Sequence, residues 1–342
     1  MSGASMRTSK KAAKSRAAKR LHINTTPLYI LLVVLLAAYI LSQGSPAIAS
    51  LAGGAVFMLI IVLLAIEFIN GYRETGFIRS IAEIAIAIII VIAFWYALGA
   101  LLRTSDPIDV VPSCSMLPAL QRGDLIILQG TDQSLSGIKA PVIDMTKAQF
   151  AGLLGEISAG PLECIAYKRA GSSVYLSQYV GTGYSVGLYR GSPSGGGVLM
   201  QNSSQSGGVI GYECGTAQVR FQNGTVLTEA YTTAIRVLNT TISGDQNNTI
   251  VVYETTPQDS FYRQGDSLIV HRLYAVLNVS GSYYFLTKGD NNPGLDIQYG
   301  NYPPNSTQIE GRVVLSVPYL GFVKLAFSGG AQPQGCNSTV LH

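Results

Sequence analysis

Three long apolar runs dominate the first third of the chain, and alternating patterns replace them afterwards. A helix that spans a membrane needs about 20 predominantly apolar residues. The second and third runs reach that length, and the first is slightly short of it. Trp95 and Tyr96 stand near the far end of the third run, where an aromatic belt is expected at the membrane surface. We therefore predict three transmembrane helices, at about residues 27–43, 47–66 and 81–102.

From Arg103 onward, short runs rich in Val, Ile, Tyr and Thr alternate with clusters of Gly, Asn, Ser and Pro. This pattern is typical of β-strands joined by turns. A short helix is expected at 148–157, and the rest of the middle of the chain shows only weak strand signals. We interpret that middle stretch as an exposed surface elaboration. The prediction is a mainly β domain made of residues 103–129 and 249–324, with a large insert at 130–248 and a C-terminal tail at 325–342.

The distribution of charge orients the helices. Residues 1–20 carry seven Lys or Arg, and no acidic residue precedes Glu67. The loop between the second and third runs holds two arginines, whereas the loop between the first and second has no charge. The positive-inside rule then makes residues 1–26 a basic cytoplasmic tail and places everything after Arg103 outside. We expect a multi-pass protein of the cell membrane with an extracytoplasmic β domain.

Two alternatives concern the N-terminal region. A basic arm can bind nucleic acid or an anionic lipid surface, and a neighbouring apolar helix favours the lipid surface. The first run is followed by Ser-Pro-Ala47-Ile-Ala49, which also resembles the cleavage site of a signal peptide. The basic tail is long for a signal peptide, so a retained helix is the preferred interpretation. Cleavage after Ala49 would leave the later topology unchanged.

The composition agrees with an extracytoplasmic membrane protein. Charged residues are 12% of the chain, against about a quarter in soluble proteins. Of the four cysteines, Cys164 and Cys214 are candidates for a disulfide, which would contribute about 4 kcal/mol by closing a loop of about 50 residues. Cys336 has no obvious partner. No metal site, phosphate loop or nucleotide fingerprint is recognisable, so no cofactor is predicted. Sequons for N-glycosylation follow Arg103 at Asn202, Asn223, Asn239, Asn247, Asn278, Asn305 and Asn337.

The candidate chemistry begins just after the third run, in Ser113-Cys114-Ser115. In an extended backbone the two serines share one face and Cys114 points to the other. Two hydroxyls on one face suit a nucleophile and an oxyanion donor, although an arbitrary Ser-x-Ser is more often ordinary surface. A thiol nucleophile at Cys114 is improbable on alternation alone. Any chemistry here would take place at the membrane surface.

Four stretches in order resemble the signatures of type I signal peptidases, in the branch of archaea and the endoplasmic reticulum. The resemblance covers about residues 103–129 and 249–324, and neither the membrane region nor the middle of the chain. It implies a membrane-bound serine endopeptidase that removes signal peptides from secreted and membrane precursors on the outer face. The stretches are Ser113–Leu120 with Gly123-Asp124, Ile269–Leu273, Thr287–Asp296, and Gly311-Arg312 with Val317–Gly321.

The resemblance also implies roles for individual residues. Ser115, directly before a methionine, would be the nucleophile, and its backbone N–H and the Ser113 hydroxyl would hold the oxyanion. A lone strand histidine is more often structural than catalytic. His271 is nevertheless the only histidine well placed in the outer domain, and the resemblance makes it the general base. Asp296 is favoured as the carboxylate that orients the imidazole, with Asp290 as a catalytic or structural support nearby.

Several alternatives stay open at this stage. Lys168, in Ala166-Tyr-Lys168-Arg169, is similar to the base of the bacterial Ser–Lys enzymes, although no Gly-Asp pair follows it. The extended residues Asp109 to Pro112 are candidates for pairing with a peptide substrate. Expected partners are precursor proteins, the lipid membrane and, as a further candidate, the translocon, but not nucleic acid. The competing function is a catalytically silent cell-surface protein whose insert is a binding module. An enzyme for one specialised precursor is a third possibility.

Overall fold

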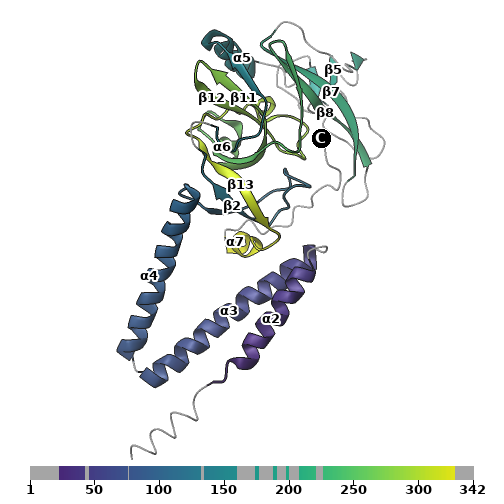
Figure 1. Ribbon diagram of the computed structural model, residues 1–342. Helices are drawn as coiled ribbons and strands as arrows, with labels where there is room; N and C mark the ends of the chain where they lie inside the picture. The colour runs from purple at the N-terminus through teal and green to yellow at the C-terminus, as the bar shows by residue number, and fades with distance from the viewer. Residues whose placement is uncertain are drawn as a thin grey trace, which may run out of the picture.

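The computed structural model describes most of the chain between residues 23 and 327 (Figure 1). Three helices form an elongated lower region, and a β domain lies above them. Gaps separate the described segments in the middle of the chain and at a few other positions. The described residues are 23–42, 46–75, 77–131, 135–159, 174–176, 188–190, 198–199, 208–220 and 226–327.

The helical region consists of α2 (Thr26–Leu41), α3 (Pro46–Thr75) and α4 (Phe77–Leu102). Helices α2 and α3 pack side by side as a hairpin, and α4 runs separately up to the β domain (Figure 1). Two of the helices are long and apolar enough to cross a membrane, at Ile48–Gly71 and Ile81–Leu102. Helix α2 is apolar but shorter than that threshold. The third span and the extracytoplasmic placement of the β domain therefore stay predictions.

Polar contacts fix the α2–α3 hairpin at both of its ends. At the lower end, the Asn70 side chain donates to the Ile23 carbonyl and accepts from the Ile23 N–H. The Thr25 hydroxyl donates to Glu67 at 2.8 Å nearby. At the upper end, the Tyr39 hydroxyl of α2 donates to the carbonyl of Pro318, which belongs to the β domain. The hairpin is therefore attached to the domain as well as to the preceding segment.

The β domain is built on one twisted sheet of seven strands, in the order β1-β2-β13-β10-β11-β12, with β3 pairing in parallel with β11. The β11–β12 hairpin turns at Ser280-Gly281, where both residues have positive φ, as a type I′ turn requires. The strands confirm the mainly β character expected after Arg103. They are β1 (Ile108–Val110), β2 (Leu125–Gln129), β3 (Val142–Met145), β10 (Ile250–Glu254), β11 (Leu268–Val279), β12 (Ser282–Lys288) and β13 (Ile309–Val317).

Short helices and two further sheets surround this sheet. Helix α5 confirms the short helix expected at 148–157. One small sheet contains β4 (Val174–Leu176), β5 (Leu188–Arg190) and β6 (Val198–Leu199). The other contains β7 (Ile210–Arg220), β8 (Val226–Val237) and β9 (Thr240–Ser243). The helices are α5 (Lys147–Ala159), α6 (Ser260–Gln264), the 3-10 turn η1 (Asp296–Tyr299) and α7 (Phe322–Phe327).

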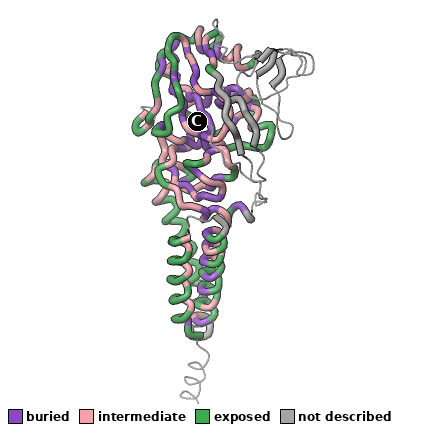
Figure 2. The backbone as a smooth tube through the Cα atoms, turned by 90° about the vertical axis from the view of Figure 1, so that its right-hand side faces the viewer, coloured by how far each residue is buried: buried purple, intermediate pink, exposed green. Residues whose placement is uncertain are grey.

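The described part of the middle stretch contributes to the domain core, unlike an exposed elaboration. Leu153 of α5 and Ile235 of β8 are completely buried against Leu277 of β11 and Leu295. Apolar side chains spaced along β3, α5 and β8 thus complete the core on one side of the main sheet. Buried residues concentrate in the β domain, and the helical region is mostly exposed in the structure (Figure 2). The burial of Leu153 and Ile235 shows that the described part of residues 130–248 is not simply an exposed surface elaboration, as the sequence had suggested.

Candidate active site

The two serines lie in a bend directly after β1, which a buried turn holds in place. Asp124 forms this turn by accepting hydrogen bonds from the N–H groups of Gln121 at 2.8 Å and Tyr319 at 3.1 Å. Burial raises the pKa of Asp124, and the two backbone donors oppose that rise. Gly123 has a φ of +90°, and a Cβ there would lie 2.3 Å from the Phe322 ring. Gly123 and Asp124, the Gly-Asp pair noted in the sequence, therefore form and stabilise this turn.

Three side chains from distant parts of the chain meet in one hydrogen-bonded series. The Ser115 hydroxyl lies 3.1 Å from Nε2 of His271. Nδ1 of the same ring lies 2.7 Å from Oδ2 of Asp296. The imidazole and the carboxylate are both buried, at 3% and 2% exposure, which fixes their relative orientation. With Nδ1 protonated, Nε2 is free to accept the proton of the serine.

The Ser113 hydroxyl lies next to the same centre, 3.1 Å from the Ser115 hydroxyl. The loop after β12 packs against the backbone of the serine segment. The Asn291 N–H donates to the Ser115 carbonyl at 2.7 Å, and a Cβ at Gly289 would lie 2.8 Å from that oxygen. Glycine is needed at position 289 because of this close approach. The loop thereby fixes the position of the Ser115 backbone.

Asp290 and Asp296 have different environments, although they lie six residues apart. Asp290 accepts two hydrogen bonds of 2.7 Å from the Arg272 guanidinium, from Nε and from one terminal nitrogen. The remaining terminal nitrogen of Arg272 donates to the carbonyls of Gln246 and Asn248. Only Asp296 contacts His271. The structure therefore places Asp290 in an ion pair that ties the loop to β11, outside the hydrogen-bonded series.

Two residues that the sequence did not single out contact the series. The Tyr253 hydroxyl, on β10, donates to Oδ2 of Asp296 at 2.9 Å, and its ring is buried. Burial, together with the Asp296 charge, raises the pKa of Tyr253 well above its ordinary value, so the hydroxyl stays a donor. Nδ2 of Asn292 lies 3.5 Å from Nε2 of His271. The second oxygen of Asp296, Oδ1, is buried without a hydrogen-bond partner in the described structure.

Strand β8 supports the loop that carries Asp296. The Thr232 N–H donates to the Pro293 carbonyl at 2.7 Å, and its hydroxyl donates to Oε1 of Gln298 at 3.0 Å. The same Gln298 oxygen accepts the N–H of Leu295 at 2.7 Å. Thr232 and Gln298 are almost completely buried. The middle stretch therefore contributes a direct contact behind the candidate site, which no local motif indicated.

The structure also bears on the remaining candidates. Cys114 is disulfide-bonded, so it has no free thiol beside the serines. Lys168, Cys164 and Cys336 lie outside the described residues, and the side chain of Cys214 is not described. Among the described residues, no group of three or more His, Cys, Asp or Glu side chains is arranged to hold a metal ion.

The site thus has the parts of a serine nucleophile with its base and orienting carboxylate. Such a series is recognised by geometry, whatever the order of its residues along the chain. Comparisons with protein-family models, with curated proteins and with solved structures give no match.

Proposed function

We propose that the chain is a membrane-bound serine endopeptidase that removes signal peptides from precursor proteins at the outer face of the cell membrane. The observation that carries the proposal is the series from Ser115 through His271 to Asp296, with contacts of 3.1 and 2.7 Å. The apolar helices Ile48–Gly71 and Ile81–Leu102 support a site held at a membrane.

The proposed mechanism follows from the positions of these atoms. Nε2 of His271 takes the proton of the Ser115 hydroxyl as the oxygen attacks the scissile carbonyl, and Asp296 stabilises the imidazolium that forms. The Ser115 N–H and the Ser113 hydroxyl stabilise the oxyanion. The imidazolium then protonates the leaving amine, which frees the mature protein. A water molecule, deprotonated by His271, hydrolyses the acyl-enzyme and restores the hydroxyl.

The substrate would bind as an added strand. Within the described sheets, β1 is the terminal strand of the main sheet and pairs with β2 alone. An extended peptide can pair with the free side of such a strand, and pockets then select its side chains. Residues Asp109 to Pro112 lead directly to the serines. Small side chains at the first and third positions before the cut, as the family resemblance implies, would fit beside this strand.

The membrane topology completes the proposal. A cytoplasmic N-terminus, three spans that include α2, and a β domain outside would place Ser115 where precursors emerge from the membrane. The contact of Tyr39 with the Pro318 carbonyl supports a fixed height of the domain over the helices. Precursors with signal peptides and the lipid membrane are the proposed partners, with the translocon as a further candidate.

Cleavage of a precursor with an Ala-x-Ala site by the detergent-solubilised protein tests the proposal. Ser115→Ala and His271→Ala are expected to lower cleavage by at least about 10³-fold, and Lys168→Ala to leave it unchanged. Sequencing the N-terminus of the product locates the cut. Loss of activity in Lys168→Ala with retention in His271→Ala would instead assign the base to the lysine. A wild-type protein that neither cuts nor labels at Ser115 with a fluorophosphonate would favour the silent surface protein.

A further inference from the structure

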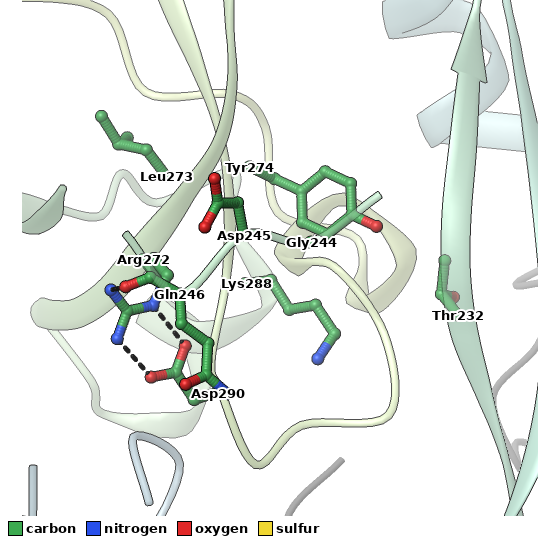
Figure 3. Close-up of a pocket in the computed structure, with 9 residues that line it drawn as sticks. All are labelled: Thr232, Gly244, Asp245, Gln246, Arg272, Leu273, Tyr274, Lys288 and Asp290. Carbon is green, nitrogen blue, oxygen red and sulfur yellow. Dashed lines mark hydrogen bonds and ion pairs between the residues drawn. The ribbon is translucent and has the colours of Figure 1, made fainter. Parts of the chain in front are cut away.

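A cavity with a buried lysine lies beside the loop that carries Asp290 (Figure 3). It has about 420 Å³ of empty space, part of it open to solvent, between β11, β12, β8 and the turn after β9. Burial there lowers the pKa of Lys288 from 10.5 to about 8, and the carboxylates of Asp290 and Asp296 oppose the fall. Neither Ser115 nor His271 lines this cavity, so a peptide substrate needs another approach to the nucleophile.

The free edge of β1 offers such an approach, because the chain passes from β1 directly into the segment of the two serines. The N–H of Val111 donates to the Asp124 carbonyl, and the Val111 carbonyl accepts from the Gly123 N–H, both at 2.9 Å. These bonds lie on the side of β2, which begins one residue after Asp124. The polar backbone groups of successive residues in a paired strand point to opposite sides. The N–H of Val110 therefore faces the free edge, where a paired peptide would place a carbonyl.

The outward N–H of Val110 is already occupied by a side chain. Oδ1 of Asp109 accepts it at 2.8 Å. The same oxygen accepts from the Lys324 amine at 2.9 Å. The Asp109 side chain is only 19% exposed, whereas the Lys324 side chain is 62% exposed. One carboxylate oxygen thus holds the donor that a substrate carbonyl would take, and a lysine holds that carboxylate in place.

The lysine reaches the edge from an element that is anchored beside β1. The Gly321 N–H, directly before α7, donates to the Gly123 carbonyl at 2.8 Å. A Cβ at Gly321 would lie 2.4 Å from the Val110 side chain, so the chain enters α7 in close contact with β1. The Phe322 ring of α7 packs against Gly123, and α7 also contacts α3. Rotation of the Asp109 side chain is therefore enough to free the Val110 N–H, without movement of α7.

We propose that Asp109, held by Lys324, competes with the peptide substrate for the outward N–H of Val110. As an extended peptide pairs with β1, one of its backbone carbonyls takes this N–H and displaces the carboxylate. In the absence of a substrate the carboxylate blocks the edge, and a charge at a sheet edge opposes unwanted pairing with other strands. The inference rests on the proposed function, since it names a substrate contact of the same site.

The first test measures kcat and KM for cleavage of the precursor with an Ala-x-Ala site. Asp109→Ala removes the competitor, so KM is expected to fall about fivefold while kcat stays unchanged. Asp109→Asn keeps a weaker, neutral acceptor and should give an intermediate KM. Damage to β1 would raise KM or lower kcat, so a fall in KM is not what a merely structural role would produce. An unchanged or raised KM in Asp109→Ala would overturn the inference.

The role of Lys324 is tested by combining variants. If the lysine acts only through Asp109, adding Lys324→Met to Asp109→Ala should change KM no further. A further fall in KM in the double variant would overturn this part of the inference. Lys139→Met, which removes an exposed lysine of the same domain, is the matched control and should keep the wild-type KM.

A second measurement separates this inference from the proposed function, because it needs no cleavage. Amide hydrogen exchange of the protein without substrate, followed by NMR, reports whether the Val110 N–H is occupied. In Asp109→Ala this amide should exchange roughly tenfold faster, whereas the Val111 amide, bonded to the Asp124 carbonyl, should keep its rate. A wild-type protein that cuts no precursor would overturn the proposed function. An unchanged exchange rate at Val110 would overturn the competition by Asp109.

Discussion

Replacing Lys288 with methionine is expected to stabilise the fold at neutral pH and to lose that advantage in alkaline solution. The pKa of Lys288 falls from 10.5 to about 8 in the folded protein. At 1.36 kcal/mol for each pKa unit, keeping this lysine charged costs the folded state about 3 kcal/mol. Methionine has a similar length and no charge, so the variant does not incur this cost.

The sign of the pH dependence follows from proton counting. Between pH 8 and 10.5 the unfolded chain keeps the lysine proton that the folded chain has released, so the stability of the wild type rises with pH there. Below pH 8 both forms are protonated, and the full cost applies. A neutral amine and a methionine leave the same carboxylates around them. The advantage of Lys288→Met should therefore shrink by about 3 kcal/mol from pH 7 to pH 10.5.

Denaturant unfolding of the detergent-solubilised protein, followed by circular dichroism of the sheet, measures this difference. Wild type, Lys288→Met and the control Lys139→Met are compared at pH 7, 8, 9 and 10.5. Other groups that titrate in this range affect all three proteins equally and cancel in the comparison. A difference between Lys288→Met and wild type that stays constant with pH would refute the reasoning. A stability difference that grows with pH would show that the predicted pH dependence has the wrong sign.

Three further predictions concern the neighbours of the site. Thr232→Val is expected to lower kcat about fivefold, since a buried neutral hydrogen bond contributes about 1 kcal/mol. Thr233→Val, which removes a similar bond to β7, should leave kcat unchanged. Asp290→Asn leaves Arg272 without its carboxylate and should lower the unfolding free energy by about 3 kcal/mol. Cleavage by the folded fraction should persist, and a fall to the level of the nucleophile variant would contradict this. Tyr253→Phe should reduce kcat about tenfold at unchanged KM, and an unchanged kcat would exclude a role for the hydroxyl.

The sequence located the three residues of the series because each lies in a stretch with a recognisable pattern. Ser115 follows an extended apolar run, His271 lies on a strand with alternating burial, and Asp296 closes a turn rich in Asn, Pro and Gly. Their meeting depends on the pairing of β2 with β13 and of β13 with β10, which joins the segment of Ser115 to the strand beside His271. The family resemblance named Ser115, His271 and Asp296 without knowledge of that pairing, and these three residues do lie together.

Local sequence patterns could not predict which of the two carboxylates contacts His271. Asp290 and Asp296 belong to one turn, and both are reasonable partners for an imidazole. Asp290 forms an ion pair with Arg272 because Arg272 lies opposite Lys288 in the β11–β12 pair. Asp290 follows Lys288 by two residues, at the start of the turn. The rest of the loop then returns toward β11 and places Asp296 within hydrogen-bond distance of His271. Which carboxylate reaches the ring is decided by strand register and loop path, and neither is visible as a motif.

The residues that were missed share one property, which is that their contacts cross between elements. Tyr253 pairs with Ile269, two positions before His271, so its ring reaches Asp296 from the neighbouring strand. Thr232 contacts the loop that carries Asp296 only because β8 packs on the main sheet. The middle of the chain has weak strand signals, and its contribution to the core could not be read from them.

The cystine at Cys114 implies an order of events in the biogenesis of the protein. Cys114 separates the two serines, and disulfides persist in oxidising compartments while the cytosol keeps thiols reduced. A newly made chain in a reducing environment lacks this covalent anchor at the segment that bears the nucleophile. The segment acquires its anchor only in an oxidising environment. A copy that stays in a reducing environment thus holds the segment of Ser113 and Ser115 by non-covalent contacts alone.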